Sequence, residues 1–261
     1  MRHGLIKRSV DWLSTAASGL VGFRKLASAG ALRKARLLNG EVRPLPRQLA
    51  RLLWEIAENE NLRNECLRAK TLYRGGDFLD VGAHEGLYSA TLAPFAQTGA
   101  RLVSIEPDPA TYPTLLDNLA ALARLFPTAL FPALPLAAGD GRNVHKTSPN
   151  PWHRSYQSNN AEAGGEGSKT LTIDQIVESL SLAPDFIKVD VEGAEYAVLK
   201  GATRTLQKFD CRLMLEIHPL WQPQEVESGS SEHLLETMNY CGEKIEESEL
   251  VQRWIYTKTR K

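Results

Sequence analysis

One stretch decides the fold of this chain: Phe78-Leu79-Asp80-Val81-Gly82-Ala83-His84-Glu85-Gly86. Its apolar start predicts a buried strand, and its glycines predict a turn in which the backbone can pass close to a ligand. A helix is expected from Leu87 to Ala96, with its N-terminus directed at that ligand. This order is typical of the first βα unit of a doubly wound α/β sheet, where such folds bind nucleotides.

The turn lacks the middle glycine of a dinucleotide fingerprint. The fingerprint G-x-G-x-x-G lets backbone N–H groups meet a pyrophosphate, whereas the run from Asp80 to Gly86 is D-x-G-x-x-x-G. Asp80 would place a carboxylate at the strand end, which suits a cationic ligand better than a diphosphate. S-adenosylmethionine has a sulfonium, an ammonium and no phosphate, so the turn favours that cofactor over a nicotinamide dinucleotide.

Composition excludes several classes of protein. The 261 residues are enough for one α/β domain with an extension. Residues 51–261 hold 21 Lys/Arg against 29 Asp/Glu, so the body is no general nucleic-acid binder. The three cysteines are scattered without a CxxC pair, which indicates neither a disulfide framework nor a zinc site and fits a cytoplasmic protein.

The N-terminal segment carries the opposite charge. Residues 1–40 hold eight Lys/Arg and one acid, and apolar residues recur at helical spacing from Ile6 to Val21. One interpretation is a helical cap packed on the domain, and another is a basic amphipathic helix at an anionic membrane or a partner protein. The composition, rich in Arg, Ser and Ala, also leaves an organellar transit peptide open. After Pro44 and Pro46, a second helix is expected from Leu49 to Leu67.

Further strands end in acidic residues. A second strand is expected from Arg101 to Ile105, followed by Glu106, which could accept hydrogen bonds from ribose hydroxyls. The helix after it should run to about Leu125. A third strand is expected from Ala129 to Ala138, and Asp140 after it either contacts adenine or forms a turn with its glycines.

The segment Arg142–Lys169 interrupts this alternation. It is polar and contains Trp152, His153, Arg154 and Tyr156. A connection this long is usually functional or disordered. Its aromatic faces would suit a polyhydroxylated substrate.

The fourth strand is expected from Asp185 to Asp190, and like the first it is an apolar strand that ends in an acid and is followed by a glycine turn and a helix. Asp190, Glu192 and Glu195 crowd the turn, and a helix should follow from Ala194 to Leu206. The two glutamates alone could simply favour a helix N-terminus, but Asp190 ends the apolar strand where the crevice should lie. After a fifth strand and a helix near Ser231–Tyr240, a closing antiparallel hairpin is expected from the strands Lys244–Glu246 and Val251–Thr257.

The fifth strand supplies candidate catalytic groups. It is expected from Cys211 to Ile217, and period-two alternation places Glu216 and His218 on one face at its end.

Together these motifs resemble the FkbM-type methyltransferases. The resemblance rests on Asp-Val-Gly-Ala-His-Glu-Gly, Ile-Glu-Pro-Asp-Pro, the run from Lys188 to Glu195 and Glu216-Ile-His218. It implies the seven-stranded, Rossmann-like fold of S-adenosylmethionine-dependent methyltransferases with an antiparallel last strand, over residues 71–261. Residues 1–70 are then a basic helical extension outside the match.

The resemblance also implies an activity and a cofactor site. Its known activities are mostly O-methylation of hydroxyls on sugars, glycolipids and secondary metabolites. The expected cofactor-binding residues are Asp80, Gly82, Ala83, Gly86, Glu106 and Asp140. The alternatives are a non-catalytic binding subunit with this fold and a nicotinamide-dependent oxidoreductase.

Methyl transfer to an alcohol calls for a base, since an alcohol is a poor nucleophile at neutral pH. The expected catalytic residues are His218, Glu216 and Asp190, with His218 favoured by its ordinary pKa. A second hypothesis is a divalent ion shared by Asp190 and Glu216. Two carboxylates make an incomplete ligand set, so no metal ligand is assigned.

Overall fold

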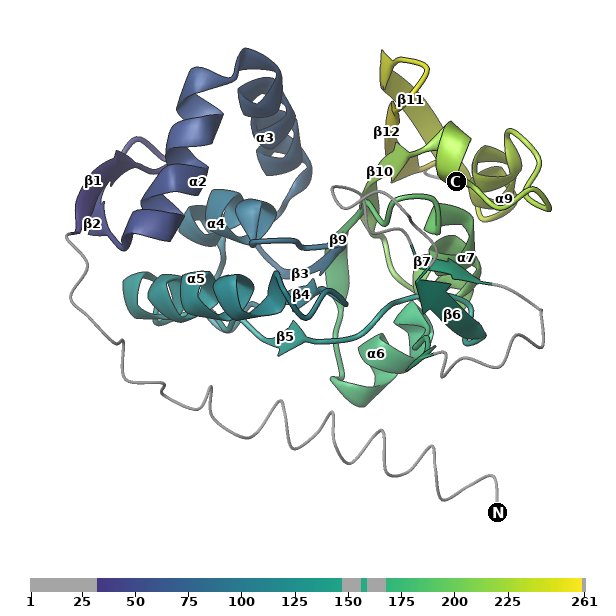
Figure 1. Ribbon diagram of the computed structural model, residues 1–261, viewed down its shortest axis with the longest axis horizontal. Coiled ribbons are helices and arrows are strands. Elements are labelled where there is room, and N and C mark those ends of the chain that lie inside the picture. The colour runs from purple at the N-terminus through teal and green to yellow at the C-terminus, as the bar shows by residue number, and fades with distance from the viewer. Residues whose placement is uncertain (1–31, 147–155, 159–167, 260–261) are drawn as a thin grey trace.

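The computed structural model describes residues 32–146, 156–158 and 168–259. In these ranges a seven-stranded sheet runs through the molecule with helices on both faces (Figure 1). In spatial order its strands are β11 (Tyr240–Glu247), β12 (Gln252–Lys258), β10 (Arg212–Ile217), β9 (Pro184–Val189), β3 (Asp77–Val81), β4 (Leu102–Ile105) and β5 (Ala133–Leu134).

The strand directions identify the sheet. Five strands, from β10 to β5 in this order, pair in parallel. β12 is antiparallel to β10 and to β11, and it lies between them. This arrangement confirms the predicted doubly wound, Rossmann-like methyltransferase sheet with an antiparallel last strand and a closing hairpin.

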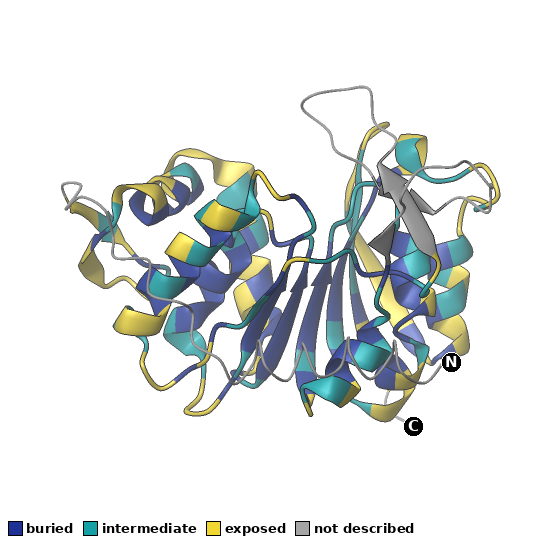
Figure 2. Ribbon diagram, turned by 60° about the horizontal axis from the view of Figure 1, so that its bottom comes forward, coloured by how far each residue is buried: buried dark blue, intermediate teal, exposed yellow. Residues whose placement is uncertain are grey.

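Successive side chains of each strand point to opposite faces of the sheet, so the core has two layers. Phe78 and Phe186 point to one face and stack with ring centroids 5.2 Å apart, while Leu79 and Ile187 point to the other. The strands are buried between the helical layers (Figure 2). By the same alternation, Asp80 and Lys188 share the face of Phe78.

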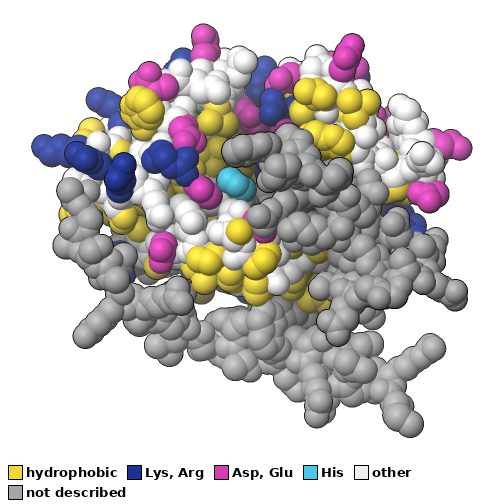
Figure 3. All heavy atoms as spheres, viewed as in Figure 1, with side chains coloured by type: hydrophobic (Ala, Val, Ile, Leu, Met, Phe, Trp, Pro, Cys, Tyr) yellow, Lys and Arg dark blue, Asp and Glu magenta, His cyan; other side chains and the backbone are white. Residues whose placement is uncertain are grey.

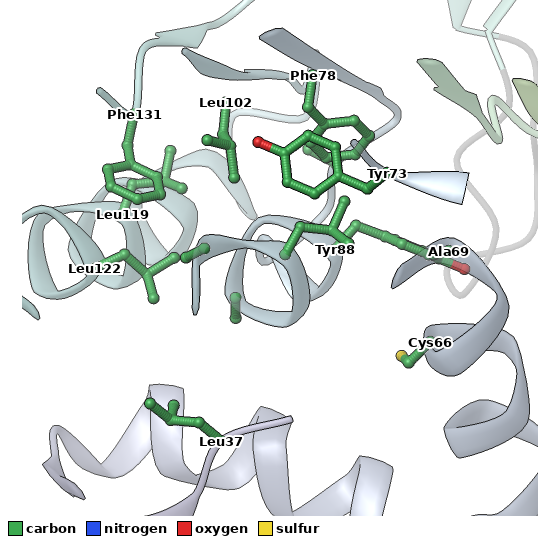
Figure 4. Close-up of a cluster of buried hydrophobic side chains, with 14 of the residues drawn as sticks. Leu37, Cys66, Ala69, Tyr73, Phe78, Tyr88, Leu102, Leu119, Leu122 and Phe131 are labelled. Atoms are coloured by element: carbon green, nitrogen blue, oxygen red, sulfur yellow. The ribbon is translucent and has the colours of Figure 1, made fainter. Parts of the chain in front are cut away.

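Helices α2 to α5 cover that first face. Figure 4 shows Phe78 and Leu102 of the sheet facing Leu119 and Leu122 of a helix. The elements are α2 (Arg47–Glu58), α3 (Glu60–Leu72), α4 (Leu87–Leu92) with the 3₁₀ turn η1 (Ala93–Phe95), and α5 (Tyr112–Leu125). On the second face lie α6 (Ile173–Ser179), α7 (Glu195–Lys200), α8 (Thr203–Lys208) and α9 (Ser230–Thr237).

Two expected elements are shorter than predicted. The third strand, expected over Ala129–Ala138, is reduced to β5, because Pro132 and Pro135 lack the N–H group that a strand ladder needs. The helix expected over Ala194–Leu206 is broken into α7 and α8 at Gly201. A Cβ there would lie 2.0 Å from the Gly139 carbonyl oxygen, so the close approach of these two segments requires glycine.

The N-terminal segment contains more structure than predicted. Strands β1 (Arg33–Arg36) and β2 (Val42–Leu45) form an unpredicted hairpin. The single helix expected from Leu49 to Leu67 is two, because Asn59 ends α2 and caps α3 by accepting a hydrogen bond from Leu62 N at 3.1 Å. The amphipathic stripe from Ile6 to Val21 lies outside the described residues. Among the described helices, none has the length and apolar character to cross a bilayer.

The polar segment before α6 forms a small sheet. Its strands are β6 (Asn143–Lys146), β7 (Tyr156–Ser158) and β8 (Ser168–Lys169). Trp152, His153 and Arg154, expected to suit a polyhydroxylated substrate, lie outside the described residues.

The start of α6 offers a test of local stability. Thr172 accepts a hydrogen bond from Gln175 N at 3.1 Å, and the Gln175 side chain accepts one from Thr172 N at 3.0 Å. Thr172→Ala removes this cap, so it should lower the free energy of unfolding by about 1 kcal/mol in urea titrations. Thr172→Ser keeps the acceptor and should recover most of the loss; an unchanged Thr172→Ala protein would contradict the assignment.

Candidate active site

In the turn after β3, the backbone amides of three successive residues donate hydrogen bonds to other protein groups. Gly82 N and Ala83 N both donate to the carbonyl oxygen of Ile105 at 3.0 Å, and His84 N donates to Glu106 Oε2 at 2.8 Å. A dinucleotide-binding turn instead points such groups at a pyrophosphate. The geometry therefore counts against the nicotinamide alternative.

The two glycines of the turn have different tasks. Gly82 has a φ of +79°, and a Cβ there would lie 1.7 Å from the carbonyl oxygen of Asp190. It therefore lets the ends of β3 and β9 meet. At Gly86, with a φ of +88°, a Cβ would lie 2.9 Å from a side-chain carbon of Leu115, so this glycine lets the turn pack against α5.

A cavity of about 670 Å³ opens at the carboxyl ends of β3, β4 and β9. Acidic side chains dominate its charge. Among the described lining residues, Lys188 is the one Lys or Arg. Five carboxylates line the cavity, those of Glu85, Glu106, Asp108, Asp190 and Glu192. Such a surface attracts cations and repels phosphates.

Glu106 is held rigidly at this cavity. Its carboxylate accepts hydrogen bonds from Asp108 N and His84 N, both at 2.8 Å, and burial raises its pKa. Each carboxylate oxygen has a further lone pair. Glu106 can therefore accept hydroxyl donors from a ligand, as expected for a ribose.

A buried ammonium group forms the floor of the site. Lys188 Nζ donates to Asp190 Oδ2 at 2.9 Å and to the Gly82 carbonyl oxygen at 3.3 Å, and it lies 4.9 Å from the Tyr88 ring centroid. Burial by itself would lower the pKa of Lys188, but the carboxylates of Asp190 and Asp80 raise it. Asp80 is fully buried, has no hydrogen-bond partner of good geometry among the described residues, and burial raises its pKa to about 7.

His218 is buried and faces Oδ1 of Asp190, whereas Lys188 binds Oδ2 of the same carboxylate. Its Nδ1 is 3.0 Å from Glu195 Oε1, and its ring stacks on Trp221 with centroids 4.7 Å apart. Its Nε2 faces the carboxylates of Glu192, Glu216 and Asp190, at 3.5, 3.6 and 4.0 Å. Burial lowers the pKa of His218, but Glu195 and the other carboxylates outweigh it and raise the pKa to about 8.

Glu192 connects this histidine with the cavity. It lines the cavity, whereas His218 does not. Its Oε2 has no hydrogen-bond partner among the described residues, and burial raises its pKa to about 7. A carboxylate with that pKa is suited to accept a proton at neutral pH.

Glu216 lies beside His218, with its Oε1 3.6 Å from Nε2, but it is also bound to Arg253. Its carboxylate accepts two hydrogen bonds from Arg253, at 2.7 and 3.2 Å, and it does not line the cavity. Asp190, Glu192 and His218 offer ligand atoms within 4.8 Å of one another, so these three could hold a cation. Glu216, the second ligand of the metal hypothesis, is not in that group.

The expected cofactor residues fall into two sets. The cavity is lined by Gly82, Ala83 and Glu106. Asp80 and Gly86 are not among the residues that line it. The structure does not bring Asp140 to the cavity, because its carboxylate is held by Arg142 Nε at 2.6 Å.

Sequence reasoning missed three groups at the site. Lys188 could have been found, since a lysine inside an apolar strand shares a face with Asp190 by period-two alternation. Glu192 and Glu195 were considered only as helix N-terminal charges. Their contacts with His218 could not be derived, because they depend on how the turn after β9 meets β10.

Comparison with known proteins adds the family. The protein-family model described as the methyltransferase FkbM domain matches residues 80–245 of the sequence. The chain belongs to the FkbM methyltransferase family. Hexuronic acid methyltransferase AglP of Haloferax volcanii is 32% identical over 160 residues, which cover 60% of this chain and 62% of AglP. The match therefore spans less than two thirds of that relative.

Solved structures include a further FkbM methyltransferase, from Methylobacillus flagellatus. It is 18% identical with a TM-score of 0.49, and the alignment covers 97% of this FkbM-family chain and 60% of the other. An O-methyltransferase from Bacillus cereus in complex with SAH is 13% identical with a TM-score of 0.47, over 82% of this chain and 90% of that one.

Proposed function

We propose that this FkbM-family protein transfers a methyl group from S-adenosylmethionine to a hydroxyl group of a sugar acid. The proposal is carried by the acid-lined cavity at a turn whose Gly82, Ala83 and His84 amides are bonded within the protein. The relative named hexuronic acid methyltransferase supports the choice of acceptor.

The lining residues fit the cofactor. Glu106 would accept hydrogen bonds from the ribose hydroxyls, and the backbone of Gly82 and Ala83 would lie against the ligand, since both residues line the cavity. The carboxylates around the cavity would stabilise the ammonium and sulfonium charges. When bound, S-adenosylmethionine supplies an electrophilic methyl carbon, which passes to the acceptor oxygen while the sulfur keeps the electron pair.

Glu192 is the base in this proposal. It would take the hydroxyl proton on its carboxylate, whose Oε2 lies 3.5 Å from His218 Nε2. Glu195 would hold the imidazole in place through Nδ1, so His218 positions Glu192. Orientation of hydroxyl and methyl would add several kcal/mol to the rate enhancement.

Glu106→Ala tests the cofactor site. The substitution should weaken S-adenosylmethionine binding by roughly 1–3 kcal/mol, because it removes the acceptor for the ribose. Titration calorimetry of both proteins with S-adenosylmethionine and with NAD measures this. Binding of NAD but not of S-adenosylmethionine by the unsubstituted protein would overturn the proposal in favour of the oxidoreductase.

A further inference from the structure

A basic groove lies on the N-terminal hairpin and α2. Its volume is about 430 Å³. Five exposed basic side chains line it: Arg33, Lys34, Arg36, Arg47 and Arg51. Figure 3 shows Lys and Arg side chains gathered over this part of the molecule.

Most of this charge is uncompensated. Arg33, Lys34 and Arg47 form no ion pair with any described residue, whereas Arg51 pairs with Glu55 and Glu85. Arginine guanidinium groups match carboxylates with two parallel hydrogen bonds. The groove therefore favours a ligand that carries several carboxylates.

An aromatic ring lies among these cations. Trp54 lines the groove and remains 62% exposed. A flat apolar face beside hydrogen-bond donors suits a sugar ring, whose own faces are apolar and whose edges are polar.

The groove adjoins the proposed active site. Arg51 lines the groove, and its ion-pair partner Glu85 lines the cofactor cavity. A chain of sugars with one residue at the cavity can therefore extend past Arg51 onto the groove.

We propose that this groove binds an acidic oligosaccharide acceptor through its carboxylates, and that the methylated sugar is one residue of that chain. The inference rests on the proposed function and adds that the acceptor is a polyanionic glycan. The basic side chains line a recess next to the active site, which favours a glycan over a membrane surface. Exposed Leu32 and Val42 on the same hairpin would suit a membrane, so vesicles form the second arm of the test.

The probe is trigalacturonic acid, with neutral maltotriose as its control, titrated into the full chain by calorimetry. Arg33→Gln/Arg47→Gln should weaken trigalacturonic acid binding by about 10- to 100-fold, because each substitution removes one contact that contributes as much as a typical net hydrogen bond. Arg68→Gln/Arg124→Gln changes two exposed arginines outside the groove and should bind like the unsubstituted protein. Maltotriose should bind to none of them.

Two results would overturn the inference. One is equal or absent binding of trigalacturonic acid in all three proteins. The other is binding to phosphatidylcholine–phosphatidylserine vesicles that depends on Arg33 and Arg47 without any binding of trigalacturonic acid, which would assign the groove to a membrane. S-adenosylmethionine titrated into the same samples reports separately on the proposed function.

Discussion

Glu192→Gln is expected to lower kcat by about 10²–10⁴-fold, the usual contribution of a general base. Glutamine keeps the size of the side chain but cannot take the proton from the acceptor hydroxyl. The affinity for S-adenosylmethionine should fall much less than kcat, since Glu106 and three other lining carboxylates keep their contacts with the cofactor. Turnover with saturating cofactor measures kcat, and calorimetry measures the affinity.

The pH profile provides a second readout. Burial raises the pKa of Glu192 to about 7, and only the ionised carboxylate can act as base. The value of kcat should therefore rise as pH increases through about 7 and level off above it. In Glu192→Gln this rise should disappear, whereas Glu227→Gln, at an exposed acid outside the cavity, should keep it.

Two outcomes would remove Glu192 from this role. One is full turnover of Glu192→Gln. The other is loss of turnover of the unsubstituted protein in EDTA that magnesium restores. That result would place a cation among Asp190, Glu192 and His218 and make the metal, rather than a free carboxylate, the activator of the hydroxyl.

Lys188→Met is expected to lower the free energy of unfolding by about 3–5 kcal/mol, because a buried carboxylate without its partner is strongly destabilising. The substitution leaves Asp80 and Asp190 without the ammonium between them. Guanidinium titrations followed by circular dichroism measure the loss. It should be smaller below a pH of about 7, where Asp80 is protonated and needs no cation.

A double variant tests the cause. Asp80→Asn should restore part of the stability of Lys188→Met, since it removes one of the two charges. Lys200→Met is the matched control: its ammonium is half-exposed, 3.9 Å from Asp140, and should matter by less than about 1 kcal/mol. An equal loss in both lysine variants would contradict the role of Lys188.

Much of the fold follows from local sequence patterns. The apolar strands that end in Asp80, Glu106 and Asp190 are adjacent in the sheet, so their carboxyl ends meet at one edge. That is why the acidic crevice could be predicted. The short length of β5 could also have been predicted from the sequence, because Pro132 and Pro135 interrupt the expected strand.

Other features depend on distant partners. Arg253 reaches Glu216 because β12 inserts beside β10 in a particular register, and no local pattern sets that register. Glu192 faces His218 because its backbone adopts a φ of +56°, which few non-glycine residues do. The basic groove depends on the β1–β2 hairpin, which the sequence analysis did not predict.

Transfer of a labelled methyl group tests the central claim most directly. The protein is incubated with S-adenosylmethionine labelled in its methyl carbon and with an acidic oligosaccharide, and the glycan is then treated with mild base. The account predicts label in the glycan that survives this treatment, because a methyl ether on a hydroxyl is stable to base. Label released by base would show a methyl ester on a carboxylate, an acceptor that needs no general base. That result, or binding of S-adenosylmethionine without any transfer to the glycan, would contradict the account.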